Sequence, residues 1–317
     1  MRVLFWGTPE FATPALRALI GEGFEVVGVV TQPDRPVGRS RSMVQSSPVK
    51  QIALDEGVPV LQPERPRGDH FVSEVSRLRP DLSVVVAYGH ILPQAVIDLP
   101  ARGTVNIHGS LLPALRGAAP IQAAIREGIG ETGITIMRMV PALDAGPIIL
   151  QARTAVLEDE TYGELSLRLS ELGALTLVEA LSLMELGNPP EQQQNDSLAT
   201  YAHKIDRSAT WVDWHASAGN VCRLIRSLDP RPGAVTMLRG SEVKLYGAKL
   251  APHGVSTMPG QIQSVDESGL TVACGEGAAR ITVVQPAGKR RLSPNEWARG
   301  RGVAIGDRFE TAPAAVS

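Results

Sequence analysis

The chain has 317 residues, of which 43% are hydrophobic and 20% are charged, and its formal net charge is −2 at pH 7. This length is typical of about two domains, and the composition is that of an ordinary soluble globular enzyme. Both exclude a chain that is too small or too polar to bury a sizeable core.

Two cysteines, Cys222 and Cys274, lie far apart, with no C-x-x-C motif and no histidine at metal spacing. They predict neither a disulfide framework nor a zinc site, and buried free thiols suit a reducing compartment. The chain passes from Met1-Arg2 directly into a strand, unlike a signal peptide, and no apolar run approaches the roughly 18 residues of a membrane span. We therefore expect a cytoplasmic protein with no metal and no membrane partner.

The first 187 residues alternate apolar strand-like runs with helical patterns. Strands are predicted at Val3–Trp6, Val26–Thr31, Val58–Leu61, Leu82–Ala87, Thr104–His108, Thr132–Val140 and Ile148–Val156. Helices are predicted near 10–21, 46–56, 69–79, 118–128 and 161–187. The pattern predicts an α/β domain over residues 1–188, with a Rossmann-like, mostly parallel sheet, helices on its faces and an antiparallel edge. Thr161 and Glu164 predict a capping box at the start of the last helix, and Gly187 predicts its end.

The turn after the first strand, Gly7-Thr8-Pro9-Glu10, invites comparison with a nucleotide-binding turn. The G-x-G-x-x-G spacing is absent, Pro9 lacks the N–H that a phosphate needs, and Glu10 puts negative charge at the helix start. A tight strand-to-helix turn with proline at the first helical position explains this segment better than a dinucleotide site.

A longer loop follows the second strand, from Gln32 to Pro48. It holds Arg35, Arg39 and Arg41 against a single acidic residue, Asp34, and contains several helix-breaking residues. Loops of this length are usually functional or disordered, so both interpretations stay open at this point.

Polar residues of three chemical kinds gather in residues 104–146. Strand alternation in Thr104–His108 directs Asn106 and His108 to one side and Val105 and Ile107 to the other. Asp144 follows the next β-branched run, in a turn bounded by proline and glycine. A carboxylate against the ring would fix its tautomer and favour the imidazolium, and an amide NH2 suits an oxygen that gains negative charge.

From residue 189 to 207 the composition becomes rich in proline, glutamine and asparagine, which predicts a linker. Beyond it, a helix near 217–227 and five short strands predict a small OB-like β-barrel over residues 208–317. The strands are predicted at 234–238, 242–248, 260–265, 270–273 and 279–284.

Charge is divided unevenly along the chain. Residues 201–317 hold 15 Lys and Arg against 10 Asp and Glu, whereas residues 1–200 hold 16 against 23. A basic C-terminal domain is what a phosphate-binding module needs, and Lys289, Arg290 and Arg291 form its most basic cluster. Domains that bind no nucleic acid also carry such a charge.

The central residues, with Ser110-Leu111-Leu112-Pro113 and Arg116-Gly117-Ala118-Ala119-Pro120-Ile121-Gln122 between them, resemble the folate-dependent formyltransferases. The likeness covers nearly the whole chain, including Gly7–Ala12 and Gln32–Pro36. Arg231-Pro232-Gly233-Ala234 and Gln285-Pro286-Ala287-Gly288-Lys289-Arg290 are similar to the tRNA-modifying branch of this family.

The resemblance implies transfer of the formyl group of 10-formyltetrahydrofolate to the α-amino group of methionine on initiator tRNA, in translation initiation. It implies Asn106, His108 and Asp144 as the catalytic set, with Asn106 and His108 on the tetrahedral intermediate and Asp144 orienting His108 and relaying a proton. The four residues Ser110, Leu111, Leu112 and Pro113 are expected to contact the folate.

In the resembled family, the loop after the second strand lies against the acceptor end of the tRNA. The family often has Gly-Arg-Gly-Lys-Lys there, where this chain has Gly38-Arg39-Ser40-Arg41-Ser42. Arg39 and Arg41 are therefore expected near the tRNA, together with Lys289, Arg290 and Arg291, and the enzyme is expected to be a monomer. A sugar-nucleotide amine as acceptor, or an RNA-binding module with a non-catalytic α/β half, are the alternatives.

Overall fold

The computed structural model describes residues 1–37, 43–187, 189–252 and 258–311. Residue contacts divide the chain into two compact units that are discontinuous in sequence. The first unit consists of Met1–Pro120, Glu131–Ala155 and Ser166–Ala202, and the second of Ile121–Gly130, Val156–Leu165 and His203–Ser317. The boundaries at 188 and 207 that the sequence suggested remain predictions.

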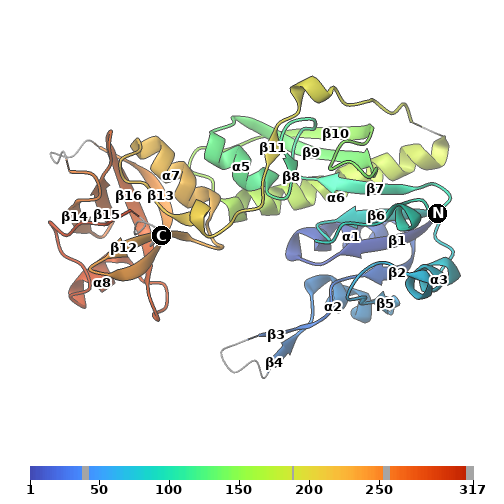
Figure 1. Cartoon of the computed structure of the whole chain (residues 1–317), viewed down its shortest axis with the longest axis horizontal. Helices are drawn as coiled ribbons and strands as arrows, with labels where there is room; N and C mark the ends of the chain where they lie inside the picture. Colours follow the sequence, from blue (N-terminus) through green and yellow to red (C-terminus); the bar gives the residue numbers. More distant parts are fainter. Residues whose placement is uncertain (38–42, 188, 253–257, 312–317) are drawn as a thin grey trace. The chain divides into compact units, whose positions relative to one another are not determined.

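The first unit is built on a seven-stranded sheet in the order β10-β9-β7-β6-β1-β2-β5 (Figure 1). Its strands are β1 (Arg2–Gly7), β2 (Glu25–Val30), β5 (Val60–Leu61), β6 (Leu82–Val86), β7 (Thr104–His108), β9 (Glu131–Arg138) and β10 (Ile148–Ala155). Neighbours from β7 to β5 pair in parallel, whereas β9 and β10 pair antiparallel. All seven predicted strands are present, and the predicted α/β class with an antiparallel edge is confirmed.

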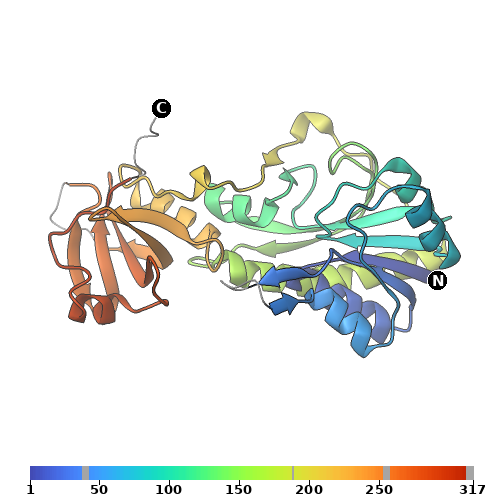
Figure 2. The same cartoon turned by 60° about the horizontal axis from the view of Figure 1, so that its bottom comes forward.

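Helices cover the sheet of the first unit on both faces. They are α1 (Thr13–Gly21), which follows a short 3-10 turn η1 (Glu10–Ala12), α2 (Pro48–Asp55), α3 (Asp69–Arg77), α4 (Gln94–Ile97) and α6 (Tyr162–Leu186). Along α6 the buried leucines Leu169, Leu177 and Leu181 form a core stripe, and Gly173 lies against Ile107 and Ile134. Figure 2 shows α6 lying along one face of the sheet.

The opposite face of the same sheet is covered by α3 and α4, whose buried residues pack in one cluster with Trp6 and Val85. The register places Trp6, Val85 and Asn106 side by side on β1, β6 and β7. Asn106 therefore lies on the α3 and α4 side, and Ile107 lies on the α6 side. This confirms the alternation expected from the sequence.

The capping box predicted at the start of α6 is formed. The Thr161 N–H donates to the Glu164 carboxylate at 2.8 Å, and the Glu164 N–H donates to the Thr161 hydroxyl at 3.3 Å.

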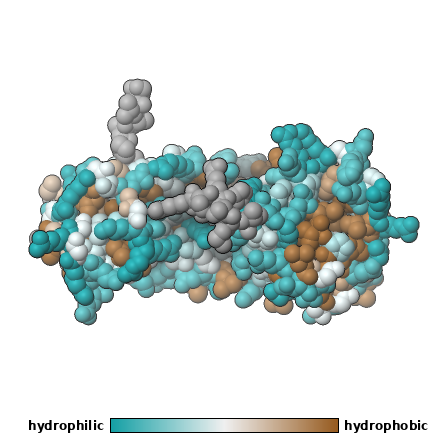
Figure 3. Space-filling model, turned by 90° about the horizontal axis from the view of Figure 1, so that it is seen from below, coloured by the Kyte–Doolittle hydropathy of each residue, from teal (hydrophilic) through white to brown (hydrophobic). Residues whose placement is uncertain are grey.

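Most atoms on the face seen in Figure 3 are hydrophilic, and a brown apolar area lies over the first unit.

A short hairpin and a two-stranded ladder accompany the main sheet. The hairpin consists of β3 (Arg35–Val37) and β4 (Met43–Gln45), and the ladder pairs β8 (Arg116–Gly117) in parallel with β11 (Tyr201–Ala202). Neither was predicted, because strands of two or three residues carry no readable period. Residues 192–202, inside the segment predicted as a linker, therefore pair with the first unit.

Polar groups anchor the chain on both sides of the hairpin. The Lys50 ammonium donates to Asp34 Oδ2 at 2.5 Å and to Gln62 Oε1 at 2.8 Å, and Gln62 Nε2 donates to Asp34 Oδ1 at 2.8 Å. The hydrogen bonds from Lys50 and Gln62 lower the pKa of the Asp34 carboxyl below its ordinary value. Asp34 thus ties the entry of the hairpin to α2 and to the chain after β5.

The second unit contains a five-stranded antiparallel sheet in the order β12-β13-β16-β15-β14. Its strands are β12 (Ala234–Leu238), β13 (Ser241–Ala251), β14 (Ile262–Asp266), β15 (Gly269–Ala273) and β16 (Ala278–Pro286), and its helices include α7 (Ala218–Ser227) and α8 (Pro294–Arg299). Helix α5 (Pro120–Glu127) falls almost wholly in this unit. Segment Arg308–Glu310 bridges both edge strands, at Met237 of β12 and at Gln261 beside β14. The predicted OB-like barrel domain is confirmed as an antiparallel sheet whose two edges share one closing segment.

Aromatic packing fixes this closing segment from the inside. Phe309 is 1% exposed, and its ring stacks on Trp214 with centroids 5.5 Å apart and on Trp297 with centroids 6.5 Å apart. The Phe309 N–H donates to the Gly260 carbonyl at 2.8 Å. The Phe309 side chain thus anchors in the core the segment whose backbone bridges both sheet edges.

Replacing Phe309 with alanine is expected to lower the free energy of unfolding of the second unit by roughly 3–5 kcal/mol, because it removes a buried ring and leaves a cavity. Urea unfolding followed by tryptophan fluorescence measures this change, since Trp214 and Trp297 lie in the unit. Ile305→Ala is the matched control, because Ile305 is 68% exposed. Equal midpoints for the two variants would contradict the assigned role of Phe309.

Replacing Lys50 with methionine is expected to lower the urea midpoint at pH 7. A carboxyl whose pKa is lowered in the folded state stabilises that state above its ordinary pKa, and the benefit is lost as the pH falls and the group is protonated. The difference between Lys50→Met and the unaltered protein should therefore shrink below about pH 4. A difference that stays constant across the acid range would show that Asp34 does not carry the effect.

Candidate functional site

His108 is the last residue of β7 and lies at the carboxyl edge of the parallel strands, where open α/β sheets place their ligands. Its ring is 5% exposed, and Nδ1 lies 3.7 Å from Asp144 Oδ2. The structure therefore brings together the imidazole and the carboxylate that the sequence singled out.

The ring of His108 is held by a backbone carbonyl. His108 Nε2 lies 2.9 Å from the Leu115 carbonyl oxygen, which can only accept, so Nε2 carries a hydrogen. The sequence suggested a carboxylate bonded to the ring, but 3.7 Å is longer than a hydrogen bond. Leu115, and not Asp144, thus holds the ring by a hydrogen bond, and Nδ1 is the nitrogen that faces the carboxylate.

Strand pairing alone does not place Asp144 next to His108. Strand β9 runs antiparallel to β7, and Arg138 at its end pairs with Val105 near the start of β7. The chain therefore leaves β9 about 10 Å, or three strand residues, from the level of His108. The loop between β9 and β10 must fold back along the sheet to bring its carboxylate to the ring.

Backbone groups hold Asp144 at the end of this return. Its carboxylate Oδ2 accepts the Gly117 N–H at 2.8 Å, and its own φ of 49° lies in the left-handed region. A charge-assisted bond from a backbone N–H orients a carboxylate without neutralising it. The side chain is mostly buried, at 15% exposure.

Asn106 supplies the third predicted group. It lies two residues before His108 on the same side of β7, and it is partly exposed. Within the described part of the chain, no hydrogen-bond partner lies against its carboxamide. Its NH2 group is therefore available to an oxygen atom of a bound molecule.

The loop of Ser110, Leu111, Leu112 and Pro113 is fixed by one local hydrogen bond and by hydrogen bonds to side chains of β9 and β10. The Ser110 hydroxyl donates to the Ala114 carbonyl at 2.6 Å, and Gln151 Nε2 donates to the Leu112 carbonyl at 3.0 Å. Buried Thr135 donates to the Ser110 carbonyl and accepts from the Leu112 N–H. Ser110 and Leu112 are thus used to shape the loop, whereas Leu111 and Pro113 are partly exposed.

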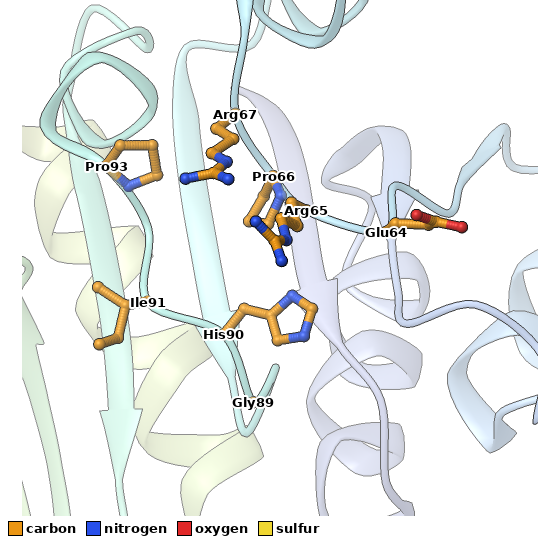
Figure 4. Close-up of a pocket in the computed structure, with 8 residues that line it drawn as sticks. All are labelled: Glu64, Arg65, Pro66, Arg67, Gly89, His90, Ile91 and Pro93. Atoms are coloured by element: carbon orange, nitrogen blue, oxygen red, sulfur yellow. The ribbon is translucent and has the colours of Figure 1, made fainter.

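A pocket of about 540 Å³ opens at the same edge of the sheet, and sequence reasoning missed it. Its lining follows β5 and β6 and consists of Glu64–Arg67 together with Gly89, His90, Ile91 and Pro93. Figure 4 shows Arg65 and His90 facing each other in the pocket. The signal was present in the sequence, because these residues closely follow two consecutive predicted strands, the partly buried β5 and the buried β6. Two guanidinium groups and an imidazole suit an anionic ligand.

Tyr88 lies beneath this pocket. Its ring packs edge-on against Trp6 and His90, at centroid distances of 5.3 and 5.5 Å. Burial raises the pKa of the Tyr88 hydroxyl to about 12, so the phenol is neutral. The side chain therefore supports the loop after β6 by packing.

The predicted basic cluster separates into three different environments. The Arg291 guanidinium lies 3.7 Å from the Tyr246 ring centroid and donates to the Pro230 carbonyl. Arg290 contacts Glu296 at 3.3 Å. Lys289 is exposed, and its ammonium has no partner within the described residues. Arg39 and Arg41, the other predicted basic pair, lie outside the described residues.

Three further features concern metal ligands, membrane spans and cysteines. The described ranges contain no group of three or more His, Cys, Asp or Glu residues that could hold a metal ion. No helix in the same ranges is both long enough and apolar enough to span a membrane. Cys222 and Cys274 are buried, and burial raises the pKa of their thiols to about 11 and about 12.

Two family models and full-length relatives match this chain. A formyl transferase family model matches residues 1–181, and a model of the formyl transferase C-terminal domain matches residues 204–302. The methionyl-tRNA formyltransferase of Marinobacter nauticus is 44% identical over 300 residues, covering 95% of this chain and 96% of its own. That of Aromatoleum aromaticum is 46% identical over 313 residues, covering 98% of both chains.

Solved structures share the fold at lower identity. HypX from Aquifex aeolicus in complex with tetrahydrofolic acid has a TM-score of 0.68 at 20% identity, covering 93% of this chain and 46% of its own. Methionyl-tRNA formyltransferase from Clostridium thermocellum has a TM-score of 0.58 at 16% identity, covering 79% of this chain and 94% of its own. The sugar 3N-formyl transferase WlaRD has a TM-score of 0.67 at 16% identity, covering 92% and 99%. From its two matched domain models and its full-length relatives, the chain belongs to the formyl transferase family.

Proposed function

We propose that the protein transfers the formyl group of 10-formyltetrahydrofolate to the α-amino group of methionine on initiator Met-tRNA. The observation that carries this proposal is the approach of His108 Nδ1 to Asp144 at 3.7 Å, next to Asn106, whose carboxamide has no hydrogen-bond partner among the described residues. The acceptor is taken from the full-length relatives, which are methionyl-tRNA formyltransferases.

The reaction consists of an attack, a build-up of charge and a bond cleavage with proton transfer. The amine attacks the formyl carbon, the formyl oxygen gains negative charge, and the C–N10 bond then breaks while a proton moves from the amine to N10. Asn106 donates its NH2 to the charged oxygen of the tetrahedral intermediate, with protonated His108 as the second stabilising group. No metal is required for these steps.

Asp144 acts on His108 through charge and on the amine as a proton acceptor. A carboxylate 3.7 Å from Nδ1 stabilises positive charge on the ring, and the burial of both side chains strengthens this interaction. The same carboxylate takes the proton of the attacking amine and passes it through water to N10. The Gly117 N–H supports this role because it keeps Oδ2 in place while the proton moves.

The folate is expected to lie against the loop of Ser110–Pro113. Leu111 and Pro113, the two partly exposed members, supply apolar contact to a flat pterin, and Ser110 and Leu112 keep the loop in shape. For the tRNA, Lys289 is the expected phosphate contact, since its ammonium is not engaged elsewhere in the described structure, with Arg39, Arg41, Arg290 and Arg291 as further candidates. We propose a cytoplasmic, monomeric enzyme.

Removing either partner of the central pair is expected to lower kcat by roughly 10² or more, because each supplies proton transfer or charge stabilisation. The variants are His108→Ala and Asp144→Asn, and the second keeps the shape of the side chain. His70→Ala and Asp55→Asn are matched controls, since both residues are exposed. Single-turnover formyl transfer by folded protein measures the effect, and rates near those of the controls would remove the pair from the mechanism.

Lys289→Ala is expected to raise the KM for charged initiator tRNA several-fold, to leave the KM for folate unchanged and to reduce the salt slope of tRNA binding by about one unit. Arg77→Ala, an exposed substitution on α3, is the control. Equal effects on both substrates would show that Lys289 does not contact the tRNA.

A panel of acceptors tests the proposed function directly. With 10-formyltetrahydrofolate as donor, we expect formyl transfer to charged initiator tRNA and none to free methionine, charged elongator tRNA, an amino-sugar nucleotide or water. Transfer to the amino sugar would instead assign the chain to the activity named for structural neighbours such as WlaRD. Absence of transfer to every acceptor would overturn the proposal.

A further inference from the structure

Gln194 stands apart within the polar segment that precedes the second unit. Its neighbours Gln192, Gln193 and Asn195 are exposed, whereas Gln194 is partly buried. Gln192 pairs with Ile148 through two backbone hydrogen bonds of 2.8 Å, which ties the segment to β10. The chain is thus held against the sheet directly beside the loop that carries Asp144.

The Gln194 side chain uses both ends of its amide. Nε2 donates to the backbone carbonyls of Asp144 and Gly146, each at 2.8 Å. Oε1 accepts from Arg116 Nε at 3.1 Å and from its terminal nitrogen at 2.8 Å. Carbonyls only accept and a guanidinium only donates, so the partners on the two sides determine which way the amide points.

Arg116, which anchors the Gln194 amide, is itself held in place by burial and by an ion pair. It is 4% exposed, and its guanidinium is also paired with Asp196 at 2.7 Å. A buried guanidinium needs such partners, because leaving it without them is costly. Gln194 therefore has a fixed base on one side and the Asp144 loop on the other.

The residue after Arg116 holds the side chain of the same aspartate whose backbone Gln194 holds. Gly117 follows Arg116 in the chain, and its N–H donates to the Asp144 carboxylate. One bond thus holds the side chain of Asp144, and Gln194 holds its backbone. The loop needs both anchors, because it leaves β9 three strand residues from the level of His108 and Asp144 adopts a positive φ.

We propose that Gln194 is a positioning residue for formyl transfer, which sets the distance between the Asp144 carboxylate and the His108 ring without contacting the substrate. This inference rests on the role given to Asp144 under the proposed function. Loss of the two amide donors lets residues 144–146 move, and the carboxylate then spends less time at the distance that proton transfer needs.

Gln194→Ala is expected to lower kcat roughly tenfold, the rate equivalent of one to two net hydrogen bonds, with the KM values for folate and tRNA unchanged. Gln194→Glu is expected to lower kcat further, because it removes both donors and turns an oxygen toward two carbonyls. Gln193→Ala, the exposed neighbour, is the control and should retain the unaltered kcat. Thermal melting of each variant shows whether it is folded.

The double variant Gln194→Ala with Asp144→Asn separates positioning from general destabilisation. If Gln194 acts through the Asp144 carboxylate, the double variant should be no slower than Asp144→Asn alone, whereas a purely structural role gives independent, multiplying losses. Multiplying losses, or a kcat for Gln194→Ala equal to that of Gln193→Ala, would overturn the inference and leave the proposed function standing. A near-native kcat for Asp144→Asn would remove Asp144 from the mechanism and overturn the inference with it, whereas the proposed function itself is overturned only by absence of transfer in the acceptor panel.

Discussion

The return of the loop between β9 and β10 is the constraint on which the site depends. Parallel pairing brings His108 to the carboxyl edge, but antiparallel β9 carries the chain away from that edge before Asp144 appears. The 3.7 Å approach of the two groups is thus a property of loop anchoring and not of sheet register. Under the proposed mechanism, every contact that holds residues 144–146 in place contributes to the chemistry, even when it does not touch the reacting atoms.

Two different groups act on the ring of His108. The Leu115 carbonyl fixes one ring nitrogen, so the carboxylate of Asp144 does not need to act as an orienting group. The Asp144 carboxylate accepts a backbone N–H instead and keeps its charge facing the ring. Orientation and electrostatics are therefore supplied by different groups, which allows each to be altered separately.

Periodicity in the sequence predicted the elements well and their irregular connections poorly. The seven strands of the first sheet and the shared side of Asn106 and His108 follow from a two-residue period, which needs no tertiary information. The hydrogen bond from His108 to Leu115 and the folding back of Asp144 depend on loop conformation, for which no period exists. Gln194 lies in a glutamine-rich stretch whose composition is that of a linker, so no local signal pointed to it. In contrast, α8 could have been found, because its capping box at Ser293 and Glu296 is legible in the sequence.

The closing segment at Arg308–Glu310 has a consequence for synthesis. Because this segment bridges β12 and the chain beside β14, both of which leave the ribosome earlier, parts of two strand edges of the second unit stay unpaired until it emerges. Open edges are templates for pairing with other nascent chains. Completion of this unit therefore waits for residues 308–310, and a polypeptide truncated upstream of Phe309 would present unpaired edge groups for chaperones and proteases to recognise.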